Sequence, residues 1–473
     1  MSLFKAGIAM ADITPRLPMA LSGQYYARTA HEVYTPLKAA VLALEGEDPV
    51  IFAICDLLSI PARLVREVRM AVAAKHTEIP TDAIILGATH IHTGPFLYND
   101  ILSVFWGDDF LLEPAPGETQ PKEYTAFLVD VLSNAIVEAW DSRAPARLRS
   151  GSNYCAVSFS RRTVYENGTA KMYGSTARPD FKKMESATDT GIHFMGIYKE
   201  SGELLCAVMN VPCPAQVLEH KNYISADYWA EVRSMVQNKY GKEVVVLPFL
   251  GAAGDLSPRD LVRLAGDEYD LYSTPMYNEE GTRMIASKIM QCFNAFMENG
   301  SPYEEQSMVR HSTATPELPV WMADEAEAAQ AKTAYDLLRS KHESIHDFTE
   351  EECMMISLYM GLMNRFEHQK THPVHGTEIH CVQIGETIVA TNPFELFVEF
   401  ADRIRAGSSI RQTMILQLAC GSDGYLPTDD AVSHGGYSAF IANGVLGPEG
   451  GTRLVEETLR LMNFYKNERV GLR

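Results

Sequence analysis

Short apolar runs along the chain are each followed by a polar or glycine-containing break and, in several cases, by a helical pattern. This order is typical of parallel strands that are buried on both faces. The clearest apolar runs cover Val50–Cys55, 83–88, Leu204–Val211, 244–250, 388–392 and 414–419. Amphipathic helices are predicted at 62–76 and 396–406. We therefore predict an α/β fold with a mostly parallel central sheet.

The pattern changes between residues 323 and 369. Two long segments there repeat apolar residues every three or four positions, and Thr349 precedes a run of glutamates as a helix N-cap would. We expect a helical hairpin inserted at about 320–370. It either packs as an excursion from the α/β body or covers a binding crevice as a lid. No second domain boundary is evident, so residues 1–473 are predicted to form one domain.

Composition narrows the class of partner. The 473 residues include 41 Lys+Arg and 61 Asp+Glu, a formal net charge of −20, which argues against a nucleic acid or an anionic membrane surface. A small-molecule substrate is expected instead, and the oligomeric state is left open. No apolar run approaches the length of about 20 residues needed to span a bilayer. The first thirty residues lack a secretory pattern and the eight cysteines form no CxxC pair, so a cytoplasmic location is expected.

The strongest chemical signal is Thr-His-Ile-His at 89–92, directly after a predicted strand. Two imidazoles at a strand end, where the ligands of α/β proteins bind, suggest a metal site. His90 and His92 are the candidates, and a structural role for either remains the alternative. A second histidine-rich stretch, with His372, His375 and His380, is interpreted as a solvated connection rather than a second metal cluster.

Other strand ends carry further candidates. GAAGDLSP at 251–258 places Asp255 and Ser257 before a proline, where Ser257 either contacts substrate or caps a helix. Arg161 and Arg162, in a polar segment expected to be a surface loop or hairpin, offer planar paired donors for a substrate oxygen or carboxylate. Two acidic residues are expected either to orient ligand histidines or to line the crevice, namely Asp56 and Asp227.

The order of these motifs resembles the catalytic domain of the neutral, non-lysosomal ceramidases. The resemblance runs from about residue 5 to about 440 and rests on KAGIAMADITP, VIFAICDLLSIP, GATHIHTGP, FSRRTVYENG, YISADYWAEV, GAAGDLSPRD, the Phe394-Glu395 step and the GYLPT and GGY segments. It implies a layered α/β/α domain with one zinc ion and hydrolysis of an N-acyl amide. The additional C-terminal β-sandwich of secreted members is not expected here.

The resemblance also implies site residues. The first zinc histidine of the family matches His90, its zinc glutamate matches Glu395, and its zinc tyrosine matches Tyr425. The second zinc histidine is replaced by Cys213 in a Cys-Pro step. Cys213 can serve as a thiolate ligand, Glu219 or His220 can take the place, or the fourth ligand is missing. The active-site serine of the family matches Ser257.

These assignments predict a zinc-dependent hydrolase that cleaves an N-acyl amide bond of a small soluble substrate with a metal-activated water. His92 is expected to transfer a proton or, alternatively, only to orient the site, and Tyr425 to stabilise the developing oxyanion. Asp255 and Ser257 complete the catalytic set, and Arg161 and Arg162 are expected to bind substrate. The alternatives are a metal-free binding or sensor protein, hydrolysis of an ester or glycoside-like bond, and a serine hydrolase acting through Ser257.

Overall fold

Two β-sheets form the centre of the molecule. The computed structural model describes residues 4–97, 117–262, 274–299, 302–304, 308–342 and 347–470, the side chains of 464–470 excepted. In spatial order, the strands of the larger sheet are β14 (Val245–Leu250), β13 (Leu204–Val211), β12 (Gly191–Lys199), β7 (Ala144–Tyr154), β1 (Lys5–Asp12), β4 (Lys38–Glu45), β5 (Val50–Cys55) and β6 (Ile84–Ala88). Those of the second are β16 (Val309–Ala314), β19 (Ile379–Ile384), β20 (Thr387–Thr391) and β22 (Gln412–Leu416).

The predicted α/β class is confirmed, but the larger sheet is mixed rather than mostly parallel. Only β5 with β6 and β13 with β14 pair in parallel, while the other neighbours in that sheet run antiparallel. In the second sheet β20 and β22 are parallel. In the sequence, a helix lies between the two strands of each parallel pair. It forms the crossover connection that parallel strands need. The apolar runs identified in the sequence are these six strands, and the antiparallel strands between them were missed.

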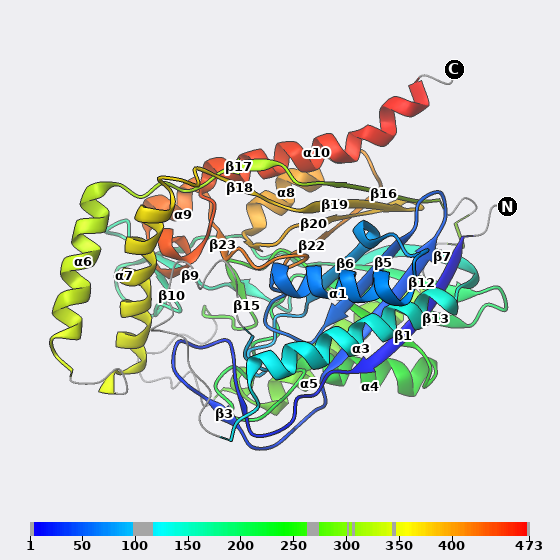
Figure 1. Ribbon diagram of the computed structural model, residues 1–473, viewed down its shortest axis with the longest axis horizontal. Coiled ribbons are helices and arrows are strands. Elements are labelled where there is room, and N and C mark those ends of the chain that lie inside the picture. The colour runs from blue at the N-terminus through cyan, green and yellow to red at the C-terminus, as the bar shows by residue number, and fades with distance from the viewer. Residues whose placement is uncertain are drawn as a thin grey trace.

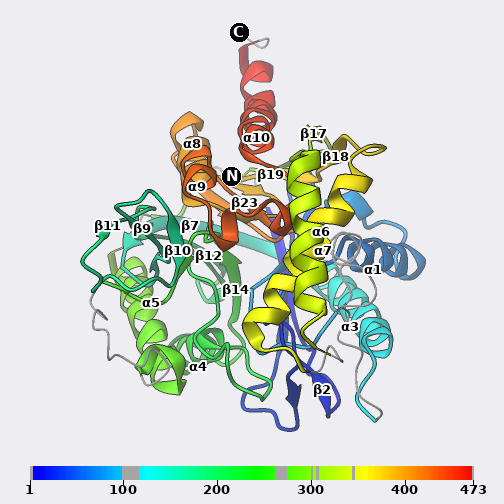
Figure 2. The same cartoon turned by 90° about the vertical axis from the view of Figure 1, so that its left-hand side faces the viewer.

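Helices enclose the sheets on the outside (Figure 1). Helices α1 (Ala62–Lys75) and α3 (Pro121–Asp141) pack against each other, and α3 covers β1 and β4. Helices α4 (Tyr228–Tyr240) and α5 (Glu279–Asn299) pack beside β14, β12 and β7. Helices α8 (Val398–Gly407) and α10 (Pro448–Val470) lie over the second sheet, on the side opposite α1 and α3 (Figures 1 and 2). The arrangement is the layered one that the resemblance implied.

The helical hairpin is confirmed as α6 (Glu325–Arg339) and α7 (Glu350–His368), which stand side by side at one end of the molecule (Figure 2). Both helices begin with a capping box, Asp324 with Glu327 and Thr349 with Glu352. Arg365 on α7 is buried and donates hydrogen bonds to the carbonyl oxygens of Trp321 and Val445. These bonds attach the hairpin to the body of the protein.

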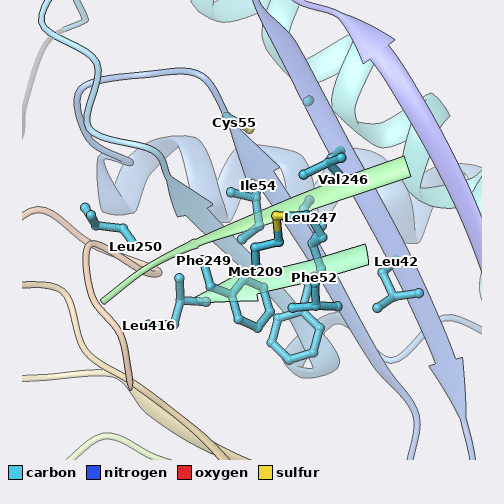
Figure 3. Close-up of a cluster of buried hydrophobic side chains, with 14 of the residues drawn as sticks. Leu42, Phe52, Ile54, Cys55, Met209, Val246, Leu247, Phe249, Leu250 and Leu416 are labelled. Atoms are coloured by element: carbon cyan, nitrogen blue, oxygen red, sulfur yellow. The ribbon is translucent and has the colours of Figure 1, made fainter. Parts of the chain in front are cut away.

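The core between the two sheets is apolar. Phe249 of β14 packs on Phe52 of β5 with ring centroids 5.0 Å apart, and Leu416 of β22 lies in the same cluster (Figure 3). This packing holds β5, β14 and β22 together and so fixes where their following loops begin. Among the described residues, no helix has the length and hydrophobicity of a bilayer span.

Candidate active site

The loops after β6, β14 and β22 start at one place because backbone hydrogen bonds join these strand ends. The N–H of Ala88 donates to Leu418, that of Cys420 to Leu86, and that of Gln417 to Leu250. The loops therefore carry the THIHTGP, GAAGDLSP and CGSDGYLPT motifs from a common edge. This convergence is what the strand-end pattern in the sequence predicted.

His90 is held in a fixed orientation. Its backbone has a positive φ of 62°, a left-handed conformation that costs free energy for a residue other than glycine. Its N–H donates to the carbonyl of Leu57, and its Nδ1 lies 2.8 Å from the carbonyl oxygen of Leu58. Because Nδ1 must carry the proton to make that bond, the lone pair of the neutral ring is on Nε2, which faces the cavity. This is the tautomer of a histidine that ligates a metal through Nε2.

Glu395 and Tyr425 are brought together by a short parallel ladder. Strand β21 (Glu395–Leu396) pairs with β23 (Tyr425–Leu426), and Glu395 is directly opposite Tyr425. The Tyr425 hydroxyl hydrogen bonds to the Glu395 carboxylate. Burial by itself raises the pKa of Glu395, but His90, Arg161 and Tyr425 outweigh burial and lower it. The carboxylate is therefore ionised, as a metal ligand has to be.

The spacing of these groups fits a zinc site. Nε2 of His90 lies 3.4 Å from Oε2 of Glu395 and 3.4 Å from Nε2 of His92. Two ligand atoms at zinc-bond distance in a tetrahedral shell lie about 3.4 Å apart. The same separations are long for direct hydrogen bonds. Nε2 of His90 and Oε2 of Glu395 therefore lie at a separation that suits two ligands of one metal ion.

His92 faces an acidic residue on its other side. Its Nδ1 is 3.6 Å from Oε2 of Glu219, and Glu219 in turn forms a 2.6 Å ion pair with the fully buried Arg259. Burial lowers the pKa of His92 well below its usual value, and His90 and the guanidinium groups of Arg28, Arg161 and Arg259 lower it further. The imidazole is therefore neutral and has a nitrogen able to accept a proton.

Arg161 is buried at the site, although the segment that carries it was expected to be a loop or hairpin on the surface. Its Nη2 donates to the Tyr425 hydroxyl at 3.1 Å and lies 3.9 Å from Oε2 of Glu395. The GAAGDLSP loop holds it, because Nη2 also donates to the Gly254 carbonyl and the Arg161 N–H donates to Asp255. The segment forms a small sheet of β9 (Arg162–Tyr165), β10 (Ala170–Met172) and β11 (Phe181–Met184).

Asp255 and Ser257 belong to the loop that contacts Arg161, and neither is among the residues that line the cavity. Oδ1 of Asp255 accepts the N–H of Val398, and Oγ of Ser257 accepts the N–H of Arg259. Ser257 lies in the short strand β15 (Leu256–Ser257) rather than at a helix cap. In this structure the two side chains support the loops that carry Arg161 and Arg259.

Two further sequence candidates have contacts of their own. Arg162 donates to Glu185, Ser438 and the carbonyl of Gly435. The Cys213 thiol is fully buried and donates to the carbonyl of Val157 at 3.3 Å. Burial raises the pKa of that thiol. Neither residue is among those that line the cavity. Glu219, another alternative for the fourth ligand, does not line the cavity either and is paired with Arg259, although it lies 3.6 Å from Nδ1 of His92.

Asp56 and Asp227 act on neighbours of the site. Asp56 is fully buried, forms a two-point ion pair with Arg233 at 2.7 and 2.8 Å, and accepts a hydrogen bond from Thr89, next to His90. Asp227 caps α4 and accepts the N–H of Leu218, next to Glu219. Neither carboxylate bonds to a histidine directly or lines the cavity, so the orienting role expected of them stays a prediction.

The site opens into a cavity of about 200 Å³. His90, His92, Glu395 and Tyr425 form its polar floor, and the apolar wall consists of Leu21, Leu58, Phe96, Leu97 and Leu418. Two tyrosines that sequence reasoning missed also line it, Tyr25 and Tyr437, with hydroxyl oxygens 2.8 Å apart. The GGY segment, which ends at Tyr437, was among the motifs of the resemblance, but no role was predicted for the tyrosine. Nothing in the sequence around Tyr25 marked it.

Two other groups of potential metal ligands lie outside this cavity. They are Glu378 with His380 and Cys420, and Glu185 with Asp430 and His434. In each group an arginine already forms an ion pair with the glutamate, Arg69 with Glu378 and Arg162 with Glu185. The interpretation of the 372–380 stretch as a solvated connection was wrong for His380, which is buried on β19 and hydrogen bonds to Glu378 and His311. These clusters are explained as ion-pair networks.

Comparison with solved structures identifies the fold. A ceramidase complexed with C2 matches with a TM-score of 0.68 at 16% sequence identity, covering 99% of this chain and 76% of that chain. The neutral ceramidase from Pseudomonas aeruginosa matches with a TM-score of 0.70 at 16% identity, covering 99% and 75%. The fold is that of the neutral ceramidases. No protein-family model and no curated protein matches the chain. The ceramidase-like fold confirms the resemblance noted from the sequence motifs.

The buried carboxyl of Asp255, in the loop that holds Arg161, should make the stability of the protein depend on pH. Burial raises the pKa of Asp255 from 3.8 to about 6. The protonated acid is therefore favoured in the folded chain, and its contribution to stability is present below pH 4 and lost as the pH rises through 6. Asp255→Asn removes this titration while keeping an acceptor for Val398. Relative to the parent, the variant should gain up to about 3 kcal/mol between pH 4 and pH 7, as measured by urea unfolding at both values.

Proposed function

We propose that this protein is a zinc-dependent hydrolase that cleaves the N-acyl amide bond of a small substrate. The observation that carries the proposal is that His90, Glu395 and Tyr425 line one cavity, with Nε2 of His90 and Oε2 of Glu395 at a separation that suits two ligands of one zinc ion and Tyr425 paired opposite Glu395. Similarity in fold to neutral ceramidases is consistent with amide hydrolysis.

His90, Glu395 and Tyr425 would hold the metal. A zinc ion with three protein ligands supplies a Lewis acid and a bound water of lowered pKa. The neutral His92 accepts a proton as water adds to the amide and returns one to the departing amine. Arg161 is not among the residues that line the cavity. It donates to the Tyr425 hydroxyl, and we assign to this pair the stabilisation of the negative charge that develops when the carbonyl carbon turns tetrahedral.

The cavity favours a short acyl group. Ligand pockets for drug-sized molecules measure roughly 300–1,000 Å³, and the part of this open cavity that the described residues line measures about 200 Å³. The apolar wall accommodates a few carbon atoms against Leu21, Leu58 and Phe96. We infer a soluble N-acyl compound, such as an acylated amino acid or amino sugar, rather than a long-chain lipid amide.

A substrate series tests this inference. N-acyl amides with the same amine and acyl chains of 2, 4, 8 and 16 carbons should be cleaved with kcat/KM highest for the short chains. Esters of the same acyl groups measure whether the site distinguishes the bond type. Exclusive cleavage of the 16-carbon amide contradicts the substrate assignment, and absence of cleavage of any member, with zinc bound, contradicts the amidase.

The role of Cys213 stays a prediction, and its contacts suggest how to test it. If the neutral thiol remains bonded to Val157, Cys213→Ala leaves the zinc content at one ion per chain. If Cys213 is a ligand, the same variant loses zinc. Because Glu219 touches His92, Glu219→Gln is the matched comparison, and its effect on zinc content identifies whether the acidic residue contributes instead.

The absence of a histidine at position 213 favours a second candidate, a binding or sensor protein that uses the same cavity without metal. Protein purified with zinc in the medium distinguishes the two. A metal-free chain that binds N-acyl compounds without converting them supports the sensor.

A further inference from the structure

Glu219 is a buried carboxylate beside the candidate active site, and the hydrolysis proposed above assigns no step to it. His92 lines the cavity, whereas Glu219 does not. The carboxylate can therefore act on a substrate in the cavity only through a neighbour. His92 is the lining residue that it approaches.

The two ring nitrogens of His92 have different neighbours. Nε2 lies 3.4 Å from Nε2 of His90, on the floor of the cavity. Nδ1 is buried, has no hydrogen-bond partner among the described residues and lies 3.6 Å from Oε2 of Glu219. That distance is longer than a hydrogen bond, but catalytic contacts are often long until substrate binds. A small movement of either side chain would join Nδ1 to Glu219.

The carboxylate of Glu219 is fixed by other side chains. Its Oε1 forms a 2.6 Å ion pair with Nη1 of Arg259, which is fully buried. Arg259 is held in turn, because its Nη2 donates to the carbonyl of Gln216 at 2.9 Å and its guanidinium lies over the Tyr277 ring. Oε2 accepts a hydrogen bond from Nε2 of Gln216 at 3.3 Å. Oε1 is therefore committed to Arg259, and Oε2 is the oxygen closer to His92.

The backbones of His92 and Glu219 are tied together by a third buried side chain, that of Arg28. Its Nη1 donates to the carbonyl oxygen of Glu219 at 2.6 Å, and its Nη2 donates to that of His92 at 2.7 Å. The two residues come from loops that are distant in the sequence, so this bridge holds them side by side. Their juxtaposition is part of the fold and does not depend on the two side chains alone.

The chemistry of a carboxylate decides which tautomer of His92 this arrangement favours. A carboxylate accepts hydrogen bonds and cannot donate one. Its position beside Nδ1 favours the neutral ring with the proton on Nδ1, which leaves the lone pair on Nε2. When Nε2 then takes up a proton, the ring becomes a cation, which the negative charge of Glu219 stabilises.

We propose that Glu219 is a positioning residue for His92: it holds the imidazole with its proton on Nδ1, so that Nε2 is the nitrogen that accepts the proton during hydrolysis. This inference rests on the function proposed above and adds to it the residue that orients the base. It differs from the alternative in which Glu219 ligates zinc.

Glu219→Gln tests the proposal, because Arg259 still requires an oxygen. The glutamine carbonyl should keep the bond to Arg259, so its NH2 group takes the place of Oε2 and presents a donor to Nδ1 of His92. The ring then accepts at Nδ1 and carries its proton on Nε2. Imidazole ¹⁵N spectra of the zinc-loaded, full-length protein, with the His92 signals assigned from His92→Gln, should show this change of tautomer.

Kinetics and zinc content of the same variant complete the test. We expect kcat to fall by at least about 10²-fold, with KM within about threefold of the parent and zinc content unchanged. Glu219→Asp keeps a group that only accepts hydrogen bonds, so it should retain the Nδ1–H tautomer and recover part of the rate.

Glu185→Gln is the matched control. Glu185 is a buried glutamate that also pairs with an arginine, Arg162, and lies 2.9 Å from a histidine nitrogen, Nδ1 of His434, but it does not line the cavity. This variant should keep the parent kcat and the parent tautomer of His92. A change of the His92 tautomer in Glu185→Gln would show that the effect is not specific to Glu219 and would overturn the proposal.

Three further results overturn it: a proton on Nε2 of His92 in the parent protein, an unchanged tautomer or kcat in folded Glu219→Gln, and loss of zinc in that variant, which would make Glu219 a ligand. The parent spectrum decides the first even if Glu219→Gln does not fold. The spectra need no substrate, so a parent that cleaves no amide contradicts the proposed function, while the position of the His92 proton is still decided.

Discussion

His90→Ala is expected to lose stoichiometric zinc and to lower kcat by at least about three orders of magnitude. His90 donates from Nδ1 to Leu58 and presents Nε2 to Glu395 and His92. Removal of the imidazole takes away a ligand and leaves no side chain able to replace it from the same backbone position. Zinc content by atomic emission and turnover of the best N-acyl substrate measure the two effects.

The matched control is the same substitution at an exposed histidine. His372 lies on the surface beside His368 and away from the cavity, so His372→Ala should retain zinc and turnover. If His90→Ala keeps one zinc per chain, the metal is bound elsewhere and the proposed site is wrong. Circular dichroism of both variants separates loss of metal from loss of fold.

Arg161→Met is expected to lower kcat by about 10²–10³-fold while zinc remains bound. The guanidinium touches the Tyr425 hydroxyl and lies near Glu395, but it is a donor and cannot itself ligate a cation. Its contribution should therefore appear in the chemical step rather than in metal affinity. Single-turnover rates and zinc content, measured on the same preparation, provide the test.

Arg161→Lys sharpens this prediction. Lysine keeps the positive charge but loses the second N–H that bonds the Gly254 carbonyl, so an intermediate rate is expected. A parent-like rate in Arg161→Met, with an intact fold, shows that Arg161 does not stabilise the transition state. Loss of zinc in that variant assigns Arg161 to support of Glu395 instead.

The sequence predicted the strands that matter for the site. The six apolar runs correspond to β5, β6, β13, β14, β20 and β22, because strands buried on both faces lack a polar face to interrupt the apolar pattern. Strands β7 and β12 were missed since exposed residues alternate with buried ones in β7, and β12 follows a polar segment. The turn at Ser201–Gly202, with Gly202 at a φ of 91°, was the available signal for the β12–β13 hairpin and hence for a mixed sheet.

The site was predictable where motif order supplied long-range information. His90 and Glu395, more than 300 residues apart in the chain, meet in one cavity, and the pairing of β21 with β23 places Tyr425 opposite Glu395. No local sequence pattern encodes either contact. The partners of His92 were harder to predict, because the Glu219–Arg259 ion pair joins two loops of ordinary composition. Tyr25 lacks any local signal and is placed by its bond to Tyr437.

Anomalous diffraction at the zinc absorption edge, on crystals grown from zinc-loaded protein, tests the central claim most directly. We predict a single strong peak within bonding distance of Nε2 of His90, the Glu395 carboxylate and the Tyr425 hydroxyl. A peak at Glu378, His380 and Cys420 instead, or none beside His90 in fully loaded protein, would contradict the account.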